Sequence, residues 1–377
     1  MLSINDLAIL ADDLSGACNV ASCFVRSCGP VPVRIHYDLP AGDGAGIEVL
    51  NTQCRSLPAG ACKASTRRAG RQLQGRRIIF MKIDTALRGS VGAEIEGLVE
   101  AIGEREVFVA PAIPGIGRTT AGGVQYDRGV PIGQTAYAAD PVSPIRSSRV
   151  LDIIRTTGHV KVRVFDASSE RDLDGVVNKA LAMPKVILVG SLGLADALAR
   201  RLPAVGGPRP ARNGPGAVVI VCGSRYPQAL AQIERAAEKL LIPLVALEPA
   251  APPRAGDELH GSRGVIYRIG DALISPEGRG PGEFLAGFAS QVAPVLESVV
   301  PCGVGIIGGD TAFALMTRCG ITTLEVEGSV AEIIAFGRIR DGSLAGCSFA
   351  VKGGSVGDDD AVIDMAACLR GKVPRNA

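Results

Sequence analysis

The chain has 377 residues, of which 47% are hydrophobic and 21% are charged. It is too long for one typical hydrophobic core, so the sequence predicts two globular domains, and this composition excludes broad disorder. The net charge is only +2, aromatic residues make up 4% and Trp is absent. Nucleic acid is therefore not expected as a partner, because massed basic residues and base-stacking platforms are missing.

The apolar segments are too short to span a membrane. None approaches the roughly 18 residues that a spanning helix needs, and Asp12 and Asp13 interrupt the first apolar stretch, so no secretory signal is expected. We therefore expect a cytoplasmic protein. The ten Cys include no Cys-x-x-Cys pair, which favours reduced structural thiols over disulfides or a zinc motif.

Short apolar stretches alternate with longer amphipathic segments through the first half of the chain. The expected strands are 7–11, 31–37, 47–51, 77–83, 106–110, 160–165 and 185–189. The expected helices lie near 16–27, 59–73, 91–102, 147–156, 172–182 and 192–201. This alternation predicts βαβ units around a mostly parallel sheet.

The segment 206–216 is dense in Pro and Gly, which excludes a helix or a central strand and predicts a linker. A second alternating series follows. Its expected strands are 217–222, 243–247, 264–268, 303–307, 322–326 and 348–351, and its expected helices are 227–240, 282–299, 311–318 and 359–369. The predicted fold class is α/β, with two Rossmann-like domains, 1–205 and 217–377, mostly parallel sheets and an interdomain cleft.

Two adjacent carboxylates, Asp12 and Asp13, follow the first expected strand, and Ser15 and Gly16 open the next helix. Asp and Ser commonly cap helices, because their side chains accept hydrogen bonds from free N–H groups. A carboxylate here could equally accept the proton of a substrate hydroxyl, as in phosphoryl transfer. The residues alone leave both interpretations open.

Charges of both signs follow the strand that ends near residue 83. Lys82, Asp84 and Arg88 could form a structural ion pair, or a clamp in which Arg binds a substrate carboxylate through two hydrogen bonds and Lys adds a point charge. Another strand end carries Asn51 and Arg55 and fits the same pocket. Open α/β sheets bind ligands at the carboxyl ends of their strands, so these groups predict a small, anionic, oxygen-rich substrate.

A long segment, 111–126, follows the strand at 106–110 and contains two Pro and several Gly. Long loops without secondary structure are usually binding loops or lids in compact domains. Arg118 and the following Thr residues offer hydrogen-bond donors to anionic oxygens. We expect an irregular binding loop here rather than a simple connector.

Three strand ends in the second half are rich in Gly, at 221–224, 304–312 and 351–357. In 304–312 a strand, a Gly-Gly turn and a helix start follow one another. Glycine lets backbone approach a ligand closely, and the N–H groups at a helix N-terminus favour phosphate. The segment is neither a Walker A loop nor Gly-x-Gly-x-x-Gly. Together the three turns predict a cradle for nucleotide phosphates.

Taken in order, these residues resemble the four-carbon acid sugar kinase family, formerly a domain of unknown function. The matching segments are 11–17, 51–55, 82–89, 111–120, 190–195, 223–224, 308–312 and 352–354. They extend over nearly the whole chain, and 82–120 is the most specific part. The resemblance implies an N-terminal domain for the acid sugar and a C-terminal domain for ATP. It also implies phosphorylation of the terminal hydroxyl of a four-carbon sugar acid such as erythronate, threonate or 3-oxo-tetronate.

On this reading, Asp13 or Asp84 orients or deprotonates the attacking hydroxyl. The candidate substrate-binding residues are Asp12, Asn51, Arg55, Lys82, Arg88, Gly117, Arg118 and Thr119. The candidate nucleotide-binding residues are Ser224, Gly308, Gly309, Asp310, Thr311, Gly353 and Gly354. Mg²⁺ is expected with ATP, because phosphoryl transfer needs a cation to offset charge. The sequence assigns no metal ligand; Asp310 is a guess.

The chain departs from the family pattern at several positions. Asn19 stands where Asp is expected, Cys54 where Ser is usual, the last Gly-rich segment differs over 353–356, and 328–338 lacks a Pro-Gly turn. These departures bear on substrate identity and activity. Two other functions stay open: a non-catalytic sensor of sugar acid or nucleotide, and a nicotinamide-dependent dehydrogenase, for which the first βα turn lacks the glycine fingerprint. A homodimer is a further possibility.

Overall fold

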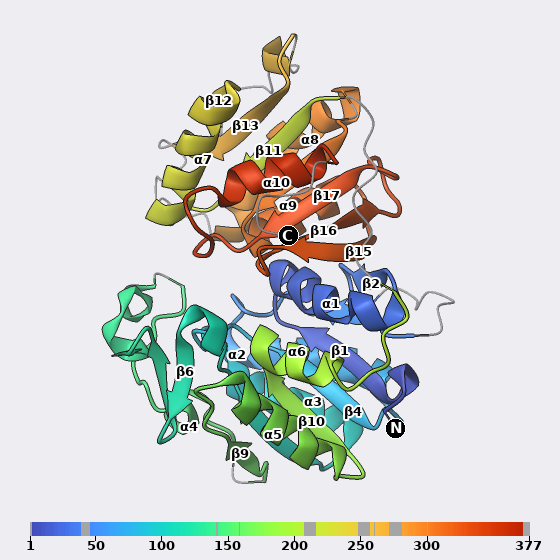
Figure 1. Cartoon of the computed structure of the whole chain (residues 1–377), viewed down its shortest axis with the longest axis vertical. Coiled ribbons are helices and arrows are strands. Elements are labelled where there is room, and N and C mark those ends of the chain that lie inside the picture. Colours follow the sequence, from blue (N-terminus) through green and yellow to red (C-terminus); the bar gives the residue numbers. More distant parts are fainter. Residues whose placement is uncertain are drawn as a thin grey trace. The chain divides into compact units, whose positions relative to one another are not determined.

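The computed structural model describes residues 2–38, 46–140, 142–157, 159–206, 216–247, 257–259, 261–270, 281–299 and 301–371. The chain folds into two compact units (Figure 1). Unit 1 comprises the residues up to Cys28 and those from His36 to Gly206, and unit 2 comprises Gly29–Ile35 and the residues from Gly207 onward. Most of the expected linker, 207–215, lies outside the described residues.

Unit 1 is built on a parallel sheet with the strand order β3-β1-β4-β10-β5-β9. Its strands are β1 (Leu7–Ala11), β3 (Val49–Asn51), β4 (Ile78–Lys82), β5 (Glu106–Ala110), β9 (Val162–Val164) and β10 (Val186–Gly190). Every residue of β1, β4 and β10 is buried. This is the pattern of strands that helices cover on both faces, and it confirms the predicted α/β class.

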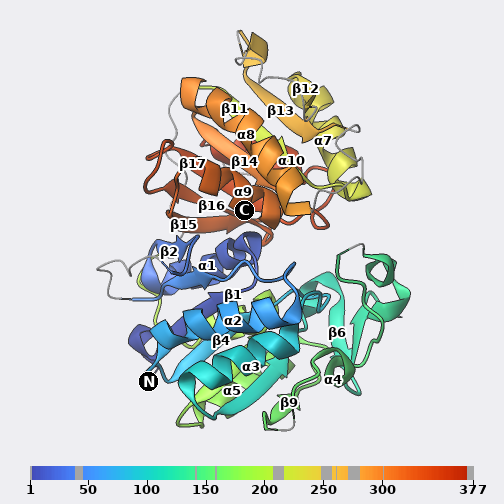
Figure 2. The ribbon, with the colours of Figure 1, turned by 180° about the vertical axis from the view of Figure 1, so that it is seen from behind.

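Helices cover the two faces of this sheet (Figures 1 and 2). One layer contains α1 (Leu14–Cys28), α5 (Glu170–Leu181) and α6 (Leu192–Ala199), and the other contains α2 (Ala59–Gly70) and α3 (Val91–Ile102). In α3 the buried Val91, Ile95 and Leu98 follow a helical period and pack into the core. Gly97 lets α3 approach α2 closely, because a Cβ there would lie 2.3 Å from the Lys63 carbonyl oxygen.

The segment after β5 is more regular than expected. It forms a small antiparallel sheet of β6 (Arg118–Ala121), β7 (Val124–Asp127) and β8 (Val130–Pro131). The expectation of an irregular loop over 111–126 is therefore wrong. Gly122 and Gly123 both have positive φ, 58° and 71°, and such a pair forms a tight hairpin turn that matches the twist of the strands. The helix expected near 147–156 is a single turn, α4 (Val150–Ile153).

Unit 2 contains a mixed sheet with the order β12-β13-β11-β14-β17-β16-β15-β2. Its strands are β2 (Val31–Arg34), β11 (Val218–Cys222), β12 (Leu244–Leu247), β13 (Gly264–Ile269), β14 (Gly303–Ile307), β15 (Thr323–Val330), β16 (Ile334–Ile339) and β17 (Ser348–Lys352). The first five in spatial order are parallel, whereas β16, β15 and β2 pair in antiparallel fashion. The local pattern of 31–34 does not reveal its partner, β15.

The strand β16 was not expected from the sequence. It pairs with β15 through a hairpin whose turn contains Ala331 and Glu332, both with positive φ, 49° and 61°. Gly, Asn or Asp usually occupies such positions, because other side chains are strained there. The turn therefore carried no recognisable signal.

Helices also cover both faces of the unit 2 sheet (Figures 1 and 2). α7 (Pro227–Leu240) packs with α10 (Ala361–Leu369), and α8 (Pro281–Val299) packs with α9 (Gly309–Arg318). Within the described residues, the 3₁₀ helices are Ile4–Asp6, Arg71–Leu73, Pro114–Ile116, Ile132–Gln134, Ala136–Ala139 and Asp257–Leu259. Among the described residues, no helix has the length and apolarity to cross a membrane.

Candidate active site

The carboxyl ends of the unit 1 strands bring most of the predicted substrate residues to one edge. Ala11 lies beside Asn51 on one neighbouring strand and beside Lys82 on the other. Lys82 in turn lies beside Gly190 of β10. Because the strands are parallel and in register, Asp12 and Asp13, Arg55, and Asp84 leave the sheet at this same edge.

Arg55 joins the two carboxylates that follow β1. Its Nε and Nη2 donate to the two oxygens of Asp12 at 2.8 and 2.6 Å, and Nη2 also donates to Asp13 Oδ1 at 2.7 Å. Burial alone would lower the pKa of Arg55, but Asp12, Asp13 and Asp84 raise it well above its usual value. The guanidinium therefore stays charged and fixes both carboxylates.

Asp13 both caps α1 and keeps a charged carboxylate at the site. Its Oδ1 accepts a hydrogen bond from the Gly16 N–H at 2.8 Å, and its Oδ2 accepts one from the Ser15 hydroxyl at 2.6 Å. Burial would raise the pKa of Asp13, but Arg55 and Lys82 outweigh it and lower the pKa. Asp13 therefore caps α1, and this capping does not exclude a role for its carboxylate in the reaction.

Gly16 is the reason that these groups can converge at the start of α1. A Cβ at this position would lie 2.4 Å from Asp13 Oδ1, 3.2 Å from Lys82 Nζ and 3.5 Å from Arg55 Nη2. Lys82 Nζ donates to the Ile83 carbonyl oxygen at 2.7 Å. Burial lowers the pKa of Lys82, although Asp12 and Asp13 oppose that effect. Opposite charges thus surround a position that only glycine leaves open.

Asp84 is held by Arg88. Arg88 Nε and Nη2 donate to the two Asp84 oxygens, and the backbone N–H groups of Ala86 and Arg88 donate to Asp84 Oδ2 at 3.1 and 3.3 Å. Burial would raise the pKa of Asp84, but Arg88 and Arg55 lower it far below its usual value. Arg88 Nη1 also donates to Asp140 Oδ2 at 3.2 Å. In this structure, Asp84 and Arg88 therefore form the structural ion pair that was one of the two interpretations.

Tyr137 lies between two arginines. The guanidinium carbons of Arg88 and Arg118 lie 5.4 and 5.2 Å from the centre of its ring. Arg118 Nη2 is 3.0 Å from Asp127 Oδ2 and 3.4 Å from the Tyr137 hydroxyl. The Nε and Nη1 of Arg118 are buried and have no hydrogen-bond partner among the described residues. Arg118 thus has buried donors available for an anion.

The remaining predicted substrate residues occupy less direct positions. Asn51 ends β3, and its side chain bonds to Gln53, whose N–H donates to Asn51 Oδ1 at 3.1 Å. Gly117 has a left-handed φ of 77° and directly precedes β6. Thr119 lies on β6 opposite Tyr126. Asn19 has a buried Oδ1 without a hydrogen-bond partner in the described part of the chain.

The carboxyl ends of the central unit 2 strands converge in the same way. Ile307 lies beside Cys222 on one neighbouring strand and beside Lys352 on the other. The Gly-rich turns that follow these residues therefore lie at one edge of the sheet. These turns and the first turn of α9 contain the predicted nucleotide residues Ser224, Gly308, Gly309, Asp310, Thr311, Gly353 and Gly354.

Glycines at this edge let the backbone pass close to the Ser224 and Thr311 hydroxyls. A Cβ on Gly354 would lie 2.2 Å from Ser224 Oγ, and a Cβ on Gly223 would lie 2.3 Å from Thr311 Oγ1. Gly308 has a φ of 110°, which L side chains rarely adopt, and α9 begins at the next residue. Glycine turns that leave hydroxyls and helix N–H groups accessible fit the phosphates of a nucleotide.

Lys352 was not among the predicted site residues, although it ends β17 beside this turn. The side chain is fully buried, and its Nζ donates to the Gly353 carbonyl oxygen at 2.8 Å. Burial lowers the pKa of Lys352 to about 8. A lysine at the end of a buried strand that leads into a Gly-Gly turn was a signal that the sequence already contained.

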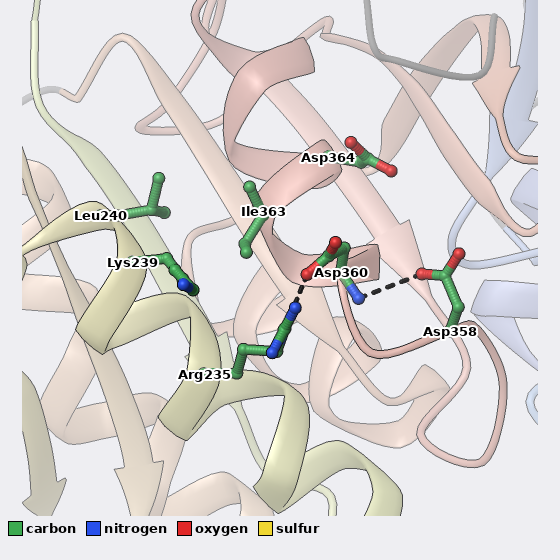
Figure 3. A pocket seen from close by; sticks show the side chains of 7 residues that line it. All are labelled: Arg235, Lys239, Leu240, Asp358, Asp360, Ile363 and Asp364. Atoms are coloured by element: carbon green, nitrogen blue, oxygen red, sulfur yellow. Dashed lines mark hydrogen bonds and ion pairs between the residues drawn. The ribbon is translucent and has the colours of Figure 1, made fainter.

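Unit 2 also contains a cavity of about 370 Å³ between α7 and α10 (Figure 3). Its lining residues are Arg235, Lys239, Leu240, Asp358, Asp360, Ile363 and Asp364. Figure 3 shows Arg235 directed at Asp360, with Nε and Oδ1 2.7 Å apart. None of the predicted nucleotide residues lines this cavity, and two of its charges pair with one another, so we assign it no ligand.

Sequence reasoning missed the acidic and aromatic residues that engage the arginines. Asp127, Tyr137 and Asp140 contact Arg88 or Arg118. They come from a segment without helical or strand periodicity, so no pattern connected them with the site. A Tyr and an Asp near a cluster of Arg residues were the available but weak signal.

Two family models match this chain. A model described as a sugar-binding N-terminal domain matches residues 7–163, and a model described as a nucleotide-binding C-terminal domain matches residues 268–362. Solved structures agree in fold. A Salmonella typhimurium LT2 protein aligns with a TM-score of 0.73 at 19% identity, over 95% of this chain and 98% of that one. A Haemophilus influenzae protein aligns at 0.70 and 18%, over 97% and 99%.

Curated relatives define the family. The chain is 30% identical to a D-threonate kinase from Cupriavidus necator, over 84% of this chain and 86% of that protein. It is 27% identical to a D-threonate kinase from Bordetella bronchiseptica over 97% of each chain, and 23% identical to a D-erythronate kinase from Heliobacterium modesticaldum over 98% of each. This chain belongs to the four-carbon acid sugar kinase family.

Proposed function

We propose that the protein transfers the γ-phosphoryl group of ATP to the terminal hydroxyl of a four-carbon sugar acid of the threonate, erythronate or 3-oxo-tetronate class. The observation that carries this proposal is the buried group of Asp13, Arg55 and Lys82 at the carboxyl edge of the unit 1 sheet. The names of the relatives support the reaction and the substrate class.

Arg118 is our first candidate for binding the substrate carboxylate. Of the four predicted cations, Arg55 and Arg88 each already donate three hydrogen bonds to protein carboxylates. Arg118 keeps two buried donors without a partner among the described residues. Lys82 is buried, and within the described residues its Nζ donates one hydrogen bond, to the Ile83 carbonyl oxygen. An ammonium group has three N–H donors, so Lys82 has others for a substrate oxygen. We therefore assign Arg118 to the carboxylate and Lys82 to a second substrate oxygen.

Asp13 is our candidate for the group that positions the attacking hydroxyl. Asp84 accepts four hydrogen bonds, which match the lone pairs of a carboxylate, whereas Asp13 accepts three and keeps a lone pair for another donor. In the proposed step the substrate hydroxyl oxygen forms a bond to the γ-phosphorus. The bond from that phosphorus to the bridging oxygen of ADP breaks, and the hydroxyl proton passes to Asp13.

In unit 2 we assign the phosphates of ATP to the turn that contains Gly308, Gly309 and Thr311, with Ser224 and Gly353–Gly354 beside it. The close approach of Gly354 to Ser224 and of Gly223 to Thr311 supports this assignment. Bound Mg²⁺ would offset the charge of the transferring phosphoryl group. Asp310 is exposed in the first turn of α9 and is the carboxylate that we would test as its ligand.

An ADP-release screen over D-threonate, D-erythronate and 3-oxo-tetronate tests the function. Release with at least one of these acids, and none with the matching neutral polyol, is expected. Binding of an acid and ATP without ADP release would favour the sensor. Binding of a nicotinamide nucleotide in place of ATP would favour the dehydrogenase.

A further inference from the structure

A cluster of Cys54, Cys62 and Glu94 lies in the interior of unit 1. Cys54 comes from the loop after β3, Cys62 from α2 and Glu94 from α3. One ligand atom of each, either Sγ or a carboxylate oxygen, lies within 4.8 Å of the other two. Their exposed fractions are 0%, 0% and 1%. Three side chains that commonly bind metals therefore converge from three separate elements.

Glu94 hydrogen-bonds with Cys54, but this contact satisfies only one of its two oxygens. Its Oε1 is buried and lacks a hydrogen-bond partner within the described residues. An acidic group with an unpaired oxygen in a core is costly unless a cation or a hydrogen-bond donor compensates it.

We propose that Cys54, Cys62 and Glu94 bind a divalent metal ion of borderline-soft character, with Zn²⁺ as the best match. Thiolate and carboxylate ligands together favour zinc over Mg²⁺ or Ca²⁺, which take oxygen ligands. Ligand atoms of a tetrahedral zinc ion lie roughly 3.5–4 Å apart, given bond lengths near 2.0–2.3 Å. Small side-chain adjustments would close the present cluster to that size, and a water molecule would complete the coordination.

The surroundings also suit a bound cation. Thr52 Oγ1 lies 3.1 Å from Cys54 Sγ and can donate to a thiolate, as outer partners of metal ligands commonly do. Two thiolates and one carboxylate around a doubly charged ion leave one net negative charge. Arg55, the residue next to Cys54, adds a nearby positive charge, although it also holds Asp12 and Asp13.

The site would stabilise the backbone from which Arg55 projects. Metal bonds would tie the loop after β3 to α2 and α3, and this loop carries the residue that holds Asp12 and Asp13. The spacing of Cys54 and Cys62 is not one of the short motifs that identify zinc sites in a sequence. Their contact with Glu94 arises only in the fold. The inference does not depend on the kinase reaction.

The test is metal binding by the full chain under reducing conditions. The protein is stripped with a chelator, titrated with Co²⁺ and Zn²⁺, and analysed for bound metal. We expect about one equivalent per chain, with a cysteine-to-cobalt charge-transfer band in the near-ultraviolet. Cys54→Ser and Cys62→Ser should each weaken that band. Loss of even an outer partner of a metal ligand costs roughly 10–100-fold in affinity, so Glu94→Gln should weaken Zn²⁺ binding at least this much.

Cys18→Ser is the matched control, because Cys18 is equally buried in α1 of the same unit but lies outside the cluster. It should keep the full equivalent and the band. If the parent shows no charge-transfer band, or binds no more metal than Cys54→Ser and Cys62→Ser, the proposal is wrong and the three groups form a neutral hydrogen-bonded cluster. The parent spectrum decides this even if a cluster variant fails to fold.

Discussion

Arg88 holds Asp84 through two parallel hydrogen bonds, from Nε to Oδ2 and from Nη2 to Oδ1, each 2.9 Å long. Asp84 is buried, and Arg88 also donates a hydrogen bond from Nη1 to Asp140 Oδ2. Asp84 is therefore committed to a structural ion pair in the described state. This relationship ranks Asp13 above Asp84 as the residue that receives the substrate proton.

Arg88→Lys should lower the free energy of unfolding and leave ATP binding unchanged. Lysine keeps the charge but loses the paired hydrogen bonds to Asp84, which costs on the order of 1.5–3 kcal/mol. Denaturant unfolding measures the loss of stability, and isothermal titration with ATP checks the binding. Arg200→Lys is the control, because Arg200 pairs with Asp174 on the exposed surface of the same unit. Equal losses in both variants, or none in either, would contradict the prediction.

Arg118→Met should act on the carboxylate of the substrate. If its free donors bind that group, the KM for the sugar acid should rise by roughly tenfold or more, because a hydrogen bond to a charged group contributes about 1.5–3 kcal/mol. Any residual turnover of the neutral polyol should not change. Steady-state kinetics with both substrates measures the difference. An unchanged KM for the acid would assign the carboxylate to another cation.

Gly354→Ala should abolish ATP binding with unit 2 still folded. The new Cβ would lie 2.2 Å from Ser224 Oγ and 2.8 Å from Ser224 Cβ, so the turn must move. Gly287→Ala is a suitable control, since a Cβ there meets nothing within 4 Å. Titration with ATP, alongside circular dichroism, separates a local effect from unfolding. Parent-like ATP affinity in Gly354→Ala would place the phosphates elsewhere.

Lys352 should make stability depend on pH in the alkaline range. Its pKa of about 8 in the folded state lies below the ordinary lysine pKa of 10.5. Between these values the unfolded state binds more protons, so the free energy of unfolding rises with pH. Below pH 8 both states are charged, and the cost of burying the ammonium is fully present. Relative to Lys352→Met, the parent should gain up to about 3 kcal/mol between pH 7 and pH 10.

Denaturant unfolding of both proteins across that range, without ligand, measures the Lys352 effect. The difference between the two proteins should shrink as pH rises. A difference that stays constant with pH would mean that Lys352 keeps an ordinary pKa.

Much of the fold could be predicted because the signals were local. The expected strands 7–11, 106–110 and 303–307 agree with β1, β5 and β14, since each is a short apolar run between turn residues. The β15–β16 hairpin escaped prediction, because Ala331 and Glu332 are unusual residues for positive φ. The pairing of β2 with β15 escaped as well, because strand partners distant in sequence leave no local pattern.

The candidate site could be predicted only in part for a related reason. Polar residues directly after strands, such as Asp13 and Arg55, are visible as breaks in apolar runs. The partners that determine their charge state are not visible in this way. Tyr137 lies in a short 3₁₀ helix and Asp140 directly follows it, and the sequence predicts neither. Glu94 lies in an amphipathic helix, where the sequence does not distinguish a buried Glu from an exposed one. Which arginines keep donors without a protein partner depends on the fold, and this favours Arg118 over Arg88 as the carboxylate ligand.

The most direct test compares ADP release by the parent and by Asp13→Asn with D-threonate, D-erythronate and 3-oxo-tetronate. The parent should release ADP with at least one acid, and Asp13→Asn should lower kcat by about 10²–10⁴-fold, the usual effect of losing a catalytic base. ATP affinity and thermal stability should change little, because Asn caps a helix nearly as well as Asp and Asp12 still holds Arg55. No ADP release by the parent with any of these acids would contradict the proposed function. Parent-like turnover in Asp13→Asn would leave Asp13 as a helix cap alone.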